Sequence, residues 1–194
     1  MEQNRKIILA SASPRRKELL EKIGLKFSVD PSHLPEDFHS DLKPEGLVKA
    51  LSLEKACVVS QKHPDAIVIA ADTIGVIRRK IIGKPHTEEE AKIILLMLSG
   101  KSHRVITGLT ILDSATKKVR TSVVETRVFF KELSPMEISS YVKTGEPLDK
   151  AGAYAIQGLA SVMVKKIEGD YYNVMGLPLY ALVENLKDFG INVL

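Results

Sequence analysis

The segment SASPRR at 11–16 combines residue types that could bind an anion. A short apolar run precedes it and an amphipathic stretch follows. The pattern therefore predicts a turn from a strand into a helix whose first N–H groups can hold a negative charge. Arg15 and Arg16 in the first turn have the wrong sign for the helix macrodipole. Their planar, forked guanidinium groups suit phosphate. Two alternatives are solvated surface arginines and a basic nucleic-acid-binding tail.

A second candidate is Asp72 with Thr73, directly after the apolar run AIVIAA at 66–71. In open α/β sheets, ligand sites gather outside the carboxyl ends of strands. An acid there could hold Mg²⁺ or deprotonate water. A turn or helix-cap aspartate is the alternative. Glu36 could supply a second carboxylate, although nothing local fixes its position.

Other candidates lie further along the chain. Lys55 and Lys84 could bind phosphate, although a lone lysine is more often a surface residue. His103 fits an ordinary polar position near the start of a strand. The segment GEPLDKAGAYAIQG at 145–158 combines turn residues, acids and a lysine without helical periodicity, which favours a loop that lines a ligand. Gln157 in it could hydrogen-bond a base edge. The sequence contains neither a dinucleotide fingerprint nor a P-loop.

Strands and helices that could position these residues alternate along the chain. Strands are expected at 5–10, 66–71, 103–113 and 119–131, with hairpins over GVIRRKIIG and between 160–167 and 171–175. Helices are expected at 14–24, 47–61, 87–100, 134–145 and 178–189, where Thr87 with Glu90 and Ser134 with Glu137 predict capping boxes. Cys57 is expected to be a small core residue of its helix. The pattern predicts an α/β fold with a mixed twisted sheet, flanking helices and one compact domain of two lobes over residues 1–194.

Charge and composition limit the possible functions. The net charge is +4, and residues 1–26 hold seven Lys/Arg against three Asp/Glu, so the excess lies there. This local field suggests an anionic small ligand rather than a nucleic-acid partner. No apolar run approaches the roughly 20 residues that span a bilayer. The single cysteine and the lack of a secretory signal favour a cytoplasmic location.

Taken together, these segments resemble the Maf family of nucleotide pyrophosphatases. The matching segments are, in the family's order, ILASASPRRKELL (8–20), Glu36, Lys55, AADT (70–73), GKP (83–85), SGKSHRVITG (99–108), GEPLDKAGAYAIQG (145–158) and GDYYNVMGLP (169–178). They cover the chain nearly end to end, which makes the resemblance specific. Ala155 stands where glycine is common in the family, and Glu36 lies in a segment, PSHLPED, that varies within the family.

The resemblance implies two lobes around a central cleft, similar to inosine triphosphate pyrophosphatases. It also implies a nucleotide diphosphatase that hydrolyses dTTP and UTP, and modified pyrimidine nucleotides, to the monophosphate and pyrophosphate with Mg²⁺ or Mn²⁺. Alternatives are a purine-preferring pyrophosphatase and a cell-division regulator that acts by binding a partner. A homodimer is reasonable for the family.

The same resemblance assigns roles to individual positions. Asp72 matches the position of the family's catalytic aspartate. Asp72 and Glu36 match the expected metal ligands, and Arg15, Thr73 and Gln157 match the positions that determine base preference. The expected phosphate-binding residues are Ser11, Arg15, Arg16, Lys55 and Lys84.

Overall fold

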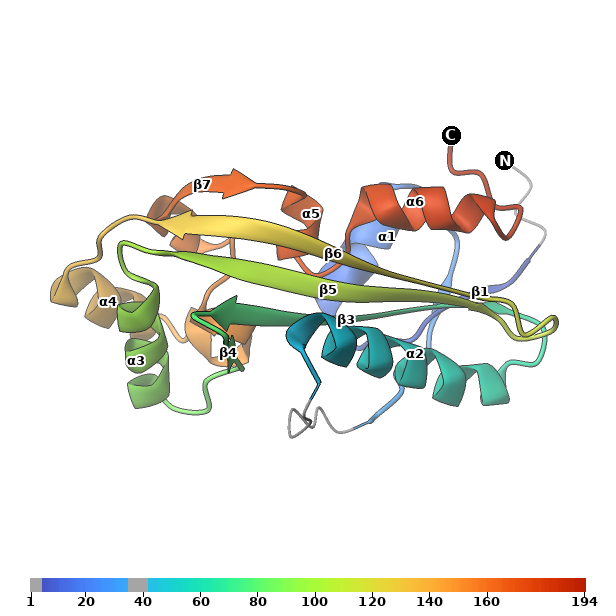
Figure 1. The fold of residues 1–194 in the computed structure, drawn as a ribbon, viewed down its shortest axis with the longest axis horizontal. Coiled ribbons are helices and arrows are strands. Elements are labelled where there is room, and N and C mark those ends of the chain that lie inside the picture. The colour runs from blue at the N-terminus through green and yellow to red at the C-terminus, as the bar shows by residue number, and fades with distance from the viewer. Residues whose placement is uncertain (1–4, 35–41) are drawn as a thin grey trace. The chain divides into compact units, whose positions relative to one another are not determined.

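The structure, a computed structural model, describes residues 5–34 and 42–194 (Figure 1). Its described strands form one seven-stranded sheet in the order β2-β1-β3-β5-β6-β7, and β4 pairs with β3. Strand β1 runs parallel to β2 and β3, whereas the β3–β4 and β6–β7 pairs are antiparallel. The prediction of an α/β fold with a mixed sheet and flanking helices is therefore confirmed.

The chain folds into two compact units. Unit 1 comprises Met1–Asp72, Thr107–Val124 and Gly176–Leu194, and unit 2 comprises Thr73–Ile106 and Glu125–Met175. Three long strands contribute residues to both units: β3 (Ile67–Ile77), β5 (Ser102–Asp113) and β6 (Val119–Phe130).

Unit 1 adds two short strands and three helices to its parts of the long strands. They are β1 (Ile7–Leu9), α1 (Pro14–Lys22), β2 (Ser28–Val29), α2 (Pro44–Lys62) and α6 (Leu179–Lys187). Helix α2 lies along one face of the sheet, and α1 and α6 lie on the other (Figure 1).

Alternation along the strands explains this layering of unit 1. Successive strand side chains point to opposite faces, so every second residue of β1 and β3 belongs to the face beneath α2. One core cluster accordingly joins α2 to that face: Ile8, Ala10, Ala56, Val59, Ala66, Val68, Ala70 and Leu112. The intervening Ile7, Leu9, Ile67 and Ile69 are also fully or almost fully buried.

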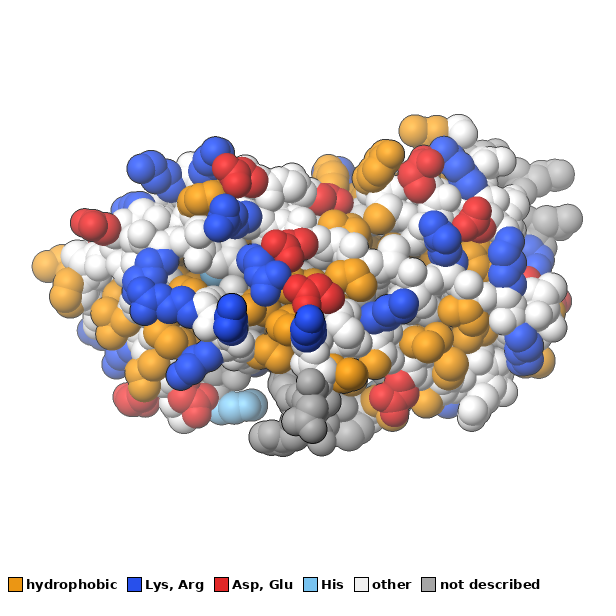
Figure 2. Space-filling view, viewed as in Figure 1, with side chains coloured by type: hydrophobic (Ala, Val, Ile, Leu, Met, Phe, Trp, Pro, Cys, Tyr) orange, Lys and Arg blue, Asp and Glu red, His pale blue; other side chains and the backbone are white. Residues whose placement is uncertain are grey.

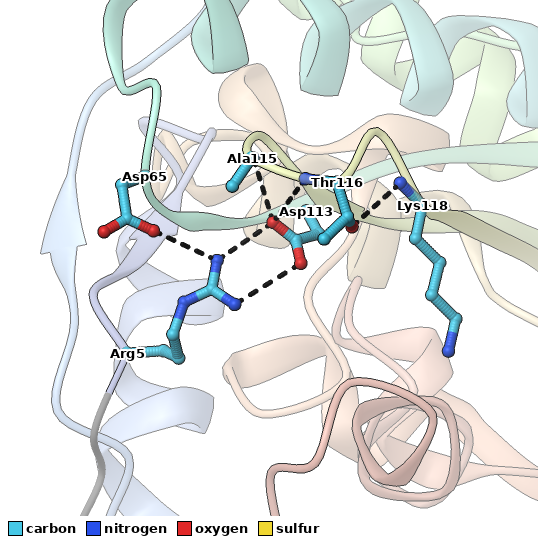
Figure 3. A network of polar contacts seen from close by, with 6 residues as sticks. All are labelled: Arg5, Asp65, Asp113, Ala115, Thr116 and Lys118. Atoms are coloured by element: carbon cyan, nitrogen blue, oxygen red, sulfur yellow. Dashed lines mark hydrogen bonds and ion pairs between the residues drawn. The ribbon is translucent and has the colours of Figure 1, made fainter.

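An ionic cluster fastens the amino end of β1 to the turn between β5 and β6 (Figure 3). Arg5 donates to Asp113 Oδ1 at 2.9 Å and lies 3.3 Å from Asp65. The same Asp113 oxygen accepts the backbone N–H groups of Ala115 and Thr116 at 2.9 and 3.3 Å. The hydrogen bond from Arg5 is the main reason why the pKa of the Asp113 carboxyl lies well below its usual range.

Unit 2 contains the remaining elements. They are β4 (Lys80–Ile82), α3 (Glu88–Leu98), α4 (Pro135–Val142), three short 3₁₀ helices η1 (Glu146–Asp149), η2 (Ala151–Ala153) and η3 (Leu159–Met163), β7 (Val164–Glu168) and α5 (Tyr171–Val174). Helices α3 and α4 pack together. The predicted hairpin over GVIRRKIIG is confirmed, with Ile77 opposite Lys80 and positive φ angles at Arg78 and Arg79.

Helix caps in unit 2 follow the sequence signals. Thr87 begins α3 by accepting the Glu90 N–H at 3.1 Å, but the Glu90 carboxylate accepts the His86 N–H, so the predicted reciprocal box is only half formed. The capping box of Ser134 and Glu137 at the start of α4 is complete.

Three local predictions are wrong. The segment 171–175 is helical rather than a strand, because Asp170 caps α5 by accepting the N–H groups of Tyr172 and Asn173 at 2.7 and 3.2 Å. The strand expected over 160–167 begins only at Val164. Cys57 is exposed, since it lies one position beyond Ala56, on the edge of the buried stripe of α2.

Candidate functional site

A buried ion pair joins Lys55 of α2 to Asp72 of β3 within unit 1. The Lys55 Nζ atom donates to Asp72 Oδ1 at 2.5 Å, and the two side chains are only 8% and 3% exposed. The second oxygen, Asp72 Oδ2, is buried without a hydrogen-bond partner among the described residues. Charges buried to this extent are costly unless paired or bound to a ligand. This second oxygen therefore marks a position prepared for a further partner.

Strand alternation brings Asp72 to Lys55. Val68 and Ala70 face α2, so Asp72 follows them on the same face two residues later. The strand was expected to end at Asp72, which is wrong: β3 continues to Ile77. The extension occurs because Ile74 and Val76 keep the strand apolar and Gly75 to Ile77 pair with β4. Asp72 is therefore held by strand backbone on both sides.

The loop between β1 and α1 forms a second group in unit 1. Pro14 opens the helix, and the Ser13 side chain caps it by accepting the Arg16 N–H. The Arg16 side chain donates from Nη1 to Ser11 Oγ at 3.1 Å and from Nε to the Gly176 carbonyl at 2.8 Å. These contacts supply a structural reason for one of the two arginines of the first turn. They also hold its guanidinium group in a fixed orientation.

Parallel pairing places the two groups close together. Leu9 lies beside Ile69, and the Ala10 N–H donates to the Ile69 carbonyl at 2.8 Å. Asp72 is three residues beyond Ile69, and Ser11 is two residues beyond Leu9. With a rise of about 3.3 Å per residue and neighbouring strands about 4.8 Å apart, the backbones of Ser11 and Asp72 lie within roughly 10 Å. The amino end of α1 and the buried acid thus belong to one region of unit 1.

Arg15 is half-buried in the first turn of α1, in unit 1. The other predicted residues lie in unit 2 or outside the described residues. Thr73 is half-buried on β3, directly after Asp72. Lys84 is exposed in the segment after β4, and Gln157 is exposed in a turn before η3. The segment that contains Lys84 and the loop that contains Gln157 are joined by a hydrogen bond of 3.1 Å from the Gly152 N–H to the Gly83 carbonyl. Glu36 falls outside the described residues.

A buried ring cluster supports the loop of 145–158 from within unit 2. His103 Nε2 lies 2.9 Å from the Tyr154 hydroxyl, and Phe130 packs edge-on against both rings. Burial lowers the pKa of His103 to about 4 and raises the pKa of Tyr154. His103 is thus a neutral core residue that anchors Tyr154, a more specific role than the ordinary polar position predicted from sequence.

The chemistry of Asp72 suits a divalent cation. Mg²⁺ is usually bound through one or two carboxylates plus substrate phosphates, and Asp72 Oδ2 is an oxygen available for such a bond. Within residues 5–34 and 42–194, no cluster of three or more His, Cys, Asp and Glu side chains is arranged to hold a metal ion. Asp72 Oδ2 is therefore the atom to which a cation shared with substrate phosphates would bind.

Three contacts around Arg16 and α2 were not predicted from the sequence. The Gly176 carbonyl orients Arg16, and nothing local in the sequence indicates that contact. Ser52 of α2 shares a hydrogen bond of 2.9 Å with Thr110 of β5. Gly108 of β5 lies directly beneath the Val48 carbonyl of α2. A glycine inside an apolar strand is a signal of such a close backbone approach, so this residue could have been identified.

Comparison with known structures and sequences agrees with the fold and identifies the family. The structure of the Staphylococcus aureus Ham1 protein matches with a TM-score of 0.53 at 12% identity, over 95% of this chain and 100% of that one. This likeness concerns the fold alone. A profile described as Maf-like protein matches residues 6–189, so the chain belongs to the Maf family.

Relatives with high identity carry one functional name. A protein of Geobacillus sp. (strain WCH70), named dTTP/UTP pyrophosphatase, is 49% identical over 96% of this chain and 99% of its own length. A protein of Syntrophus aciditrophicus (strain SB) with the same name is 48% identical over 95% of this chain and 90% of its own length.

Proposed function

We propose that this protein hydrolyses dTTP and UTP, and modified pyrimidine triphosphates, to the nucleoside monophosphate and pyrophosphate. The observation that carries the proposal is the buried Lys55–Asp72 pair beside the amino end of α1, because it combines an available carboxylate oxygen with fixed cationic groups. The relatives' shared name supports the choice of substrates.

The triphosphate would be held by the groups at the amino end of α1. The helix offers N–H groups at its positive end, and Arg16 is already oriented by Ser11 and the Gly176 carbonyl. Arg15, half-buried in the same turn, adds a second guanidinium group. Lys55 and Lys84 complete the set of phosphate-binding cations in this proposal. Such fixed donors stabilise charge that develops on the phosphates in the transition state.

Hydrolysis then requires a water molecule opposite the leaving pyrophosphate. Asp72 Oδ2 accepts a hydrogen bond from this water and takes its proton as the oxygen attacks the α-phosphorus. The bond between the α-phosphorus and the bridging oxygen breaks, and pyrophosphate leaves with the bonding electrons. Lys55 donates to Oδ1, which leaves Oδ2 as the oxygen that accepts the proton in this proposal.

A divalent cation, Mg²⁺ or Mn²⁺, belongs to the proposal. Asp72 would hold it, together with Glu36, through the lone pair of Oδ2 that the attacking water does not use. When bound, such a cation neutralises charge on the phosphates and on the departing pyrophosphate.

Base recognition is assigned to Thr73, Gln157 and Arg15. The amide of Gln157 has both a donor and an acceptor, which match the donor and acceptor on the pairing edge of uracil or thymine. Its exposed position at the tip of a turn leaves it accessible to a ligand.

A panel of triphosphates tests the activity directly. We expect Mg²⁺- or Mn²⁺-dependent release of monophosphate and pyrophosphate from dTTP and UTP, with slower turnover of cytidine and purine nucleotides. Preference for a purine would replace the substrate assignment. Turnover of none of them, together with binding to a protein or nucleic acid, would favour the partner-binding regulator. The face drawn in Figure 2 bears on the nucleic-acid alternative. Its Lys and Arg side chains are interspersed with Asp and Glu, whereas a nucleic-acid surface is usually a basic stripe.

The variant Asp72→Asn tests the mechanism. Asparagine keeps an oxygen for Lys55 but removes the acceptor at Oδ2, so turnover should fall by about 10²-fold or more. Asp113→Asn is the matched control, because Asp113 is also a buried aspartate of unit 1 that is paired with a cation. It should lower stability by about 1–2 kcal/mol without changing turnover. Near-normal pyrophosphate release by Asp72→Asn would reject the mechanism.

A homodimer and a cytoplasmic location are further parts of the proposal. Sedimentation of the purified chain and fractionation of cells test them. None of the helices in the described residues has the length and apolar content needed to cross a membrane.

A further inference from the structure

Glu146 at the start of η1 turns its carboxylate onto the backbone that follows Gln157. Its Oε2 accepts the Leu159 N–H at 3.0 Å, and its Oε1 accepts the Tyr141 hydroxyl at 2.9 Å. The Ala160 N–H points to Oε1 at 3.5 Å. All these residues belong to unit 2. Glu146 thus joins helix α4, through Tyr141, to the first turn of η3.

The chemistry of these contacts suits a carboxylate. Both backbone partners and the Tyr141 hydroxyl act as donors, and an ionised carboxylate is a side chain that only accepts. Hydrogen bonds of backbone N–H groups to a charged acceptor are among the stronger ones in proteins. A side chain without an acceptor at this position would leave both N–H groups to water.

Gly158 gives the carboxylate its space. A Cβ atom built on Gly158 would lie 2.3 Å from Glu146 Oε1 and 2.5 Å from Cδ, whereas real Cβ atoms stay more than 3.0 Å from their neighbours. The approach of the carboxylate to the backbone therefore depends on glycine at 158.

The turn that carries Gln157 is fixed on both sides by these contacts. The Gly158 N–H donates to the Ala155 carbonyl at 3.0 Å, which closes a four-residue turn with Gln157 near its tip. Ala155 on the entering side is only 7% exposed. Glu146 holds the leaving side at Leu159. The Gln157 side chain itself remains exposed.

We propose that Glu146 is a positioning residue for base discrimination: it fixes the backbone of the Gln157 turn without contacting the nucleotide. This inference rests on the proposed function, in which Gln157 contacts the pyrimidine. A glutamine amide can pair with the edge of uracil or, after a flip, with that of cytosine. Discrimination between dTTP and dCTP therefore depends on how closely the surrounding structure fixes its reach and angle.

The test compares Glu146→Ala, Glu146→Gln and a matched control, Glu137→Ala. Glu137 is also a glutamate of unit 2 that accepts a backbone N–H at the start of a helix, but its partner is Ser134 and not the Gln157 turn. For each purified full-length variant, kcat/KM is measured with dTTP and with dCTP, and thermal unfolding is followed.

We expect Glu146→Ala to reduce the preference for dTTP over dCTP by about 10- to 100-fold, because displacing a positioning element by about 1 Å costs roughly this much. Glu146→Gln should restore most of the preference, since its amide oxygen can still accept the Leu159 N–H. Glu137→Ala should lower the unfolding temperature and keep the preference. Adding Gln157→Ala to Glu146→Ala should reduce the preference little beyond either single change, because both act through one group.

Three outcomes overturn the inference. The first is an unchanged preference in Glu146→Ala. The second is a loss of preference in Glu137→Ala as large as that in Glu146→Ala, which would reveal a general effect of instability. The third applies to Glu146→Gln. If Glu146→Ala does not fold, Glu146→Gln alone decides through amide hydrogen exchange at Leu159: exchange unchanged, with a changed preference, also overturns it. A wild-type chain that turns over no triphosphate would instead refute the proposed function, and this inference with it.

Discussion

Gly108 offers a quantitative test of how α2 positions Lys55. A Cβ atom added at Gly108 would lie 2.1 Å from the Val48 carbonyl oxygen, 2.4 Å from its carbon and 2.9 Å from the Lys49 nitrogen. All three neighbours are backbone atoms of α2, so no side chain can rotate away. The helix and β5 are in direct backbone contact here, and Gly108→Ala must separate them.

The geometry sets the size of the displacement. Ordinary van der Waals contact of a Cβ atom begins at 3.4 Å, so α2 must withdraw by about 1 Å from β5. Lys55 follows Val48 by two helical turns on the same buried face. A shift of this size stretches the 2.5 Å contact between Lys55 and Asp72 to the limit of a hydrogen bond. We expect a loss of about 1–3 kcal/mol in unfolding free energy and of about 10²-fold in turnover.

Chemical denaturation and steady-state pyrophosphate release measure the two effects. Gly75→Ala is the matched control, because a Cβ atom there would meet Ile82 at an ordinary 3.6 Å. That strand glycine should tolerate alanine with little change in either quantity. Wild-type turnover and stability in Gly108→Ala would refute the reasoning. They would mean that the contact between α2 and β5 does not control the position of Lys55.

Two pH predictions follow from buried groups. Burial lowers the pKa of His103 to about 4, and the unfolded chain has a value near 6.5. The unfolded state therefore binds the proton at a higher pH than the folded state. The contribution of neutral His103 to the free energy of unfolding is complete above pH 6.5 and declines by about 3 kcal/mol as the pH falls towards 4. Denaturation midpoints of wild type and His103→Asn at pH 7 and 4.5 check this, and parallel pH profiles would contradict it. The hydrogen bond from Arg5 lowers the pKa of Asp113. The free energy of unfolding that this ionised carboxyl contributes is therefore lost as the pH falls below about 4. The denaturation midpoint of Asp113→Asn should fall less than that of wild type over this pH range.

Local signals in the sequence predicted most elements of the fold. The helix at 14–22 has a serine cap, a proline at its first position and paired leucines on one face, and all of these act within a few residues. The segment 171–175 misled because its aromatic residues favour a strand, whereas Asp170 caps a helix there. Asp72 was expected at a strand end for a similar reason, since the hairpin that follows it was treated as a separate element.

The contacts within the candidate site depend on how elements dock, which local patterns do not encode. Lys55 was predicted as a phosphate ligand from the family resemblance, but its pairing with Asp72 depends on which face of α2 meets β3. The hydrogen bond from Arg16 to the Gly176 carbonyl joins residues that are 160 positions apart in the sequence. Glu146 could not be distinguished from the other acids of its loop by spacing alone.

The small residues beneath α2 explain why a charged pair can be buried there. Ala10, Ala66 and Ala70 from the sheet side and Ala56 of α2 form much of the shared core, and Gly108 has no Cβ atom that would prevent backbone contact. A helix that sits this close to the sheet brings a lysine stem directly over the strand. The ammonium group then meets Asp72 where water is excluded, so each charge has to be satisfied by the other or by a ligand. The small side chains between α2 and the sheet therefore account both for the close packing and for the burial of Asp72 beside Lys55.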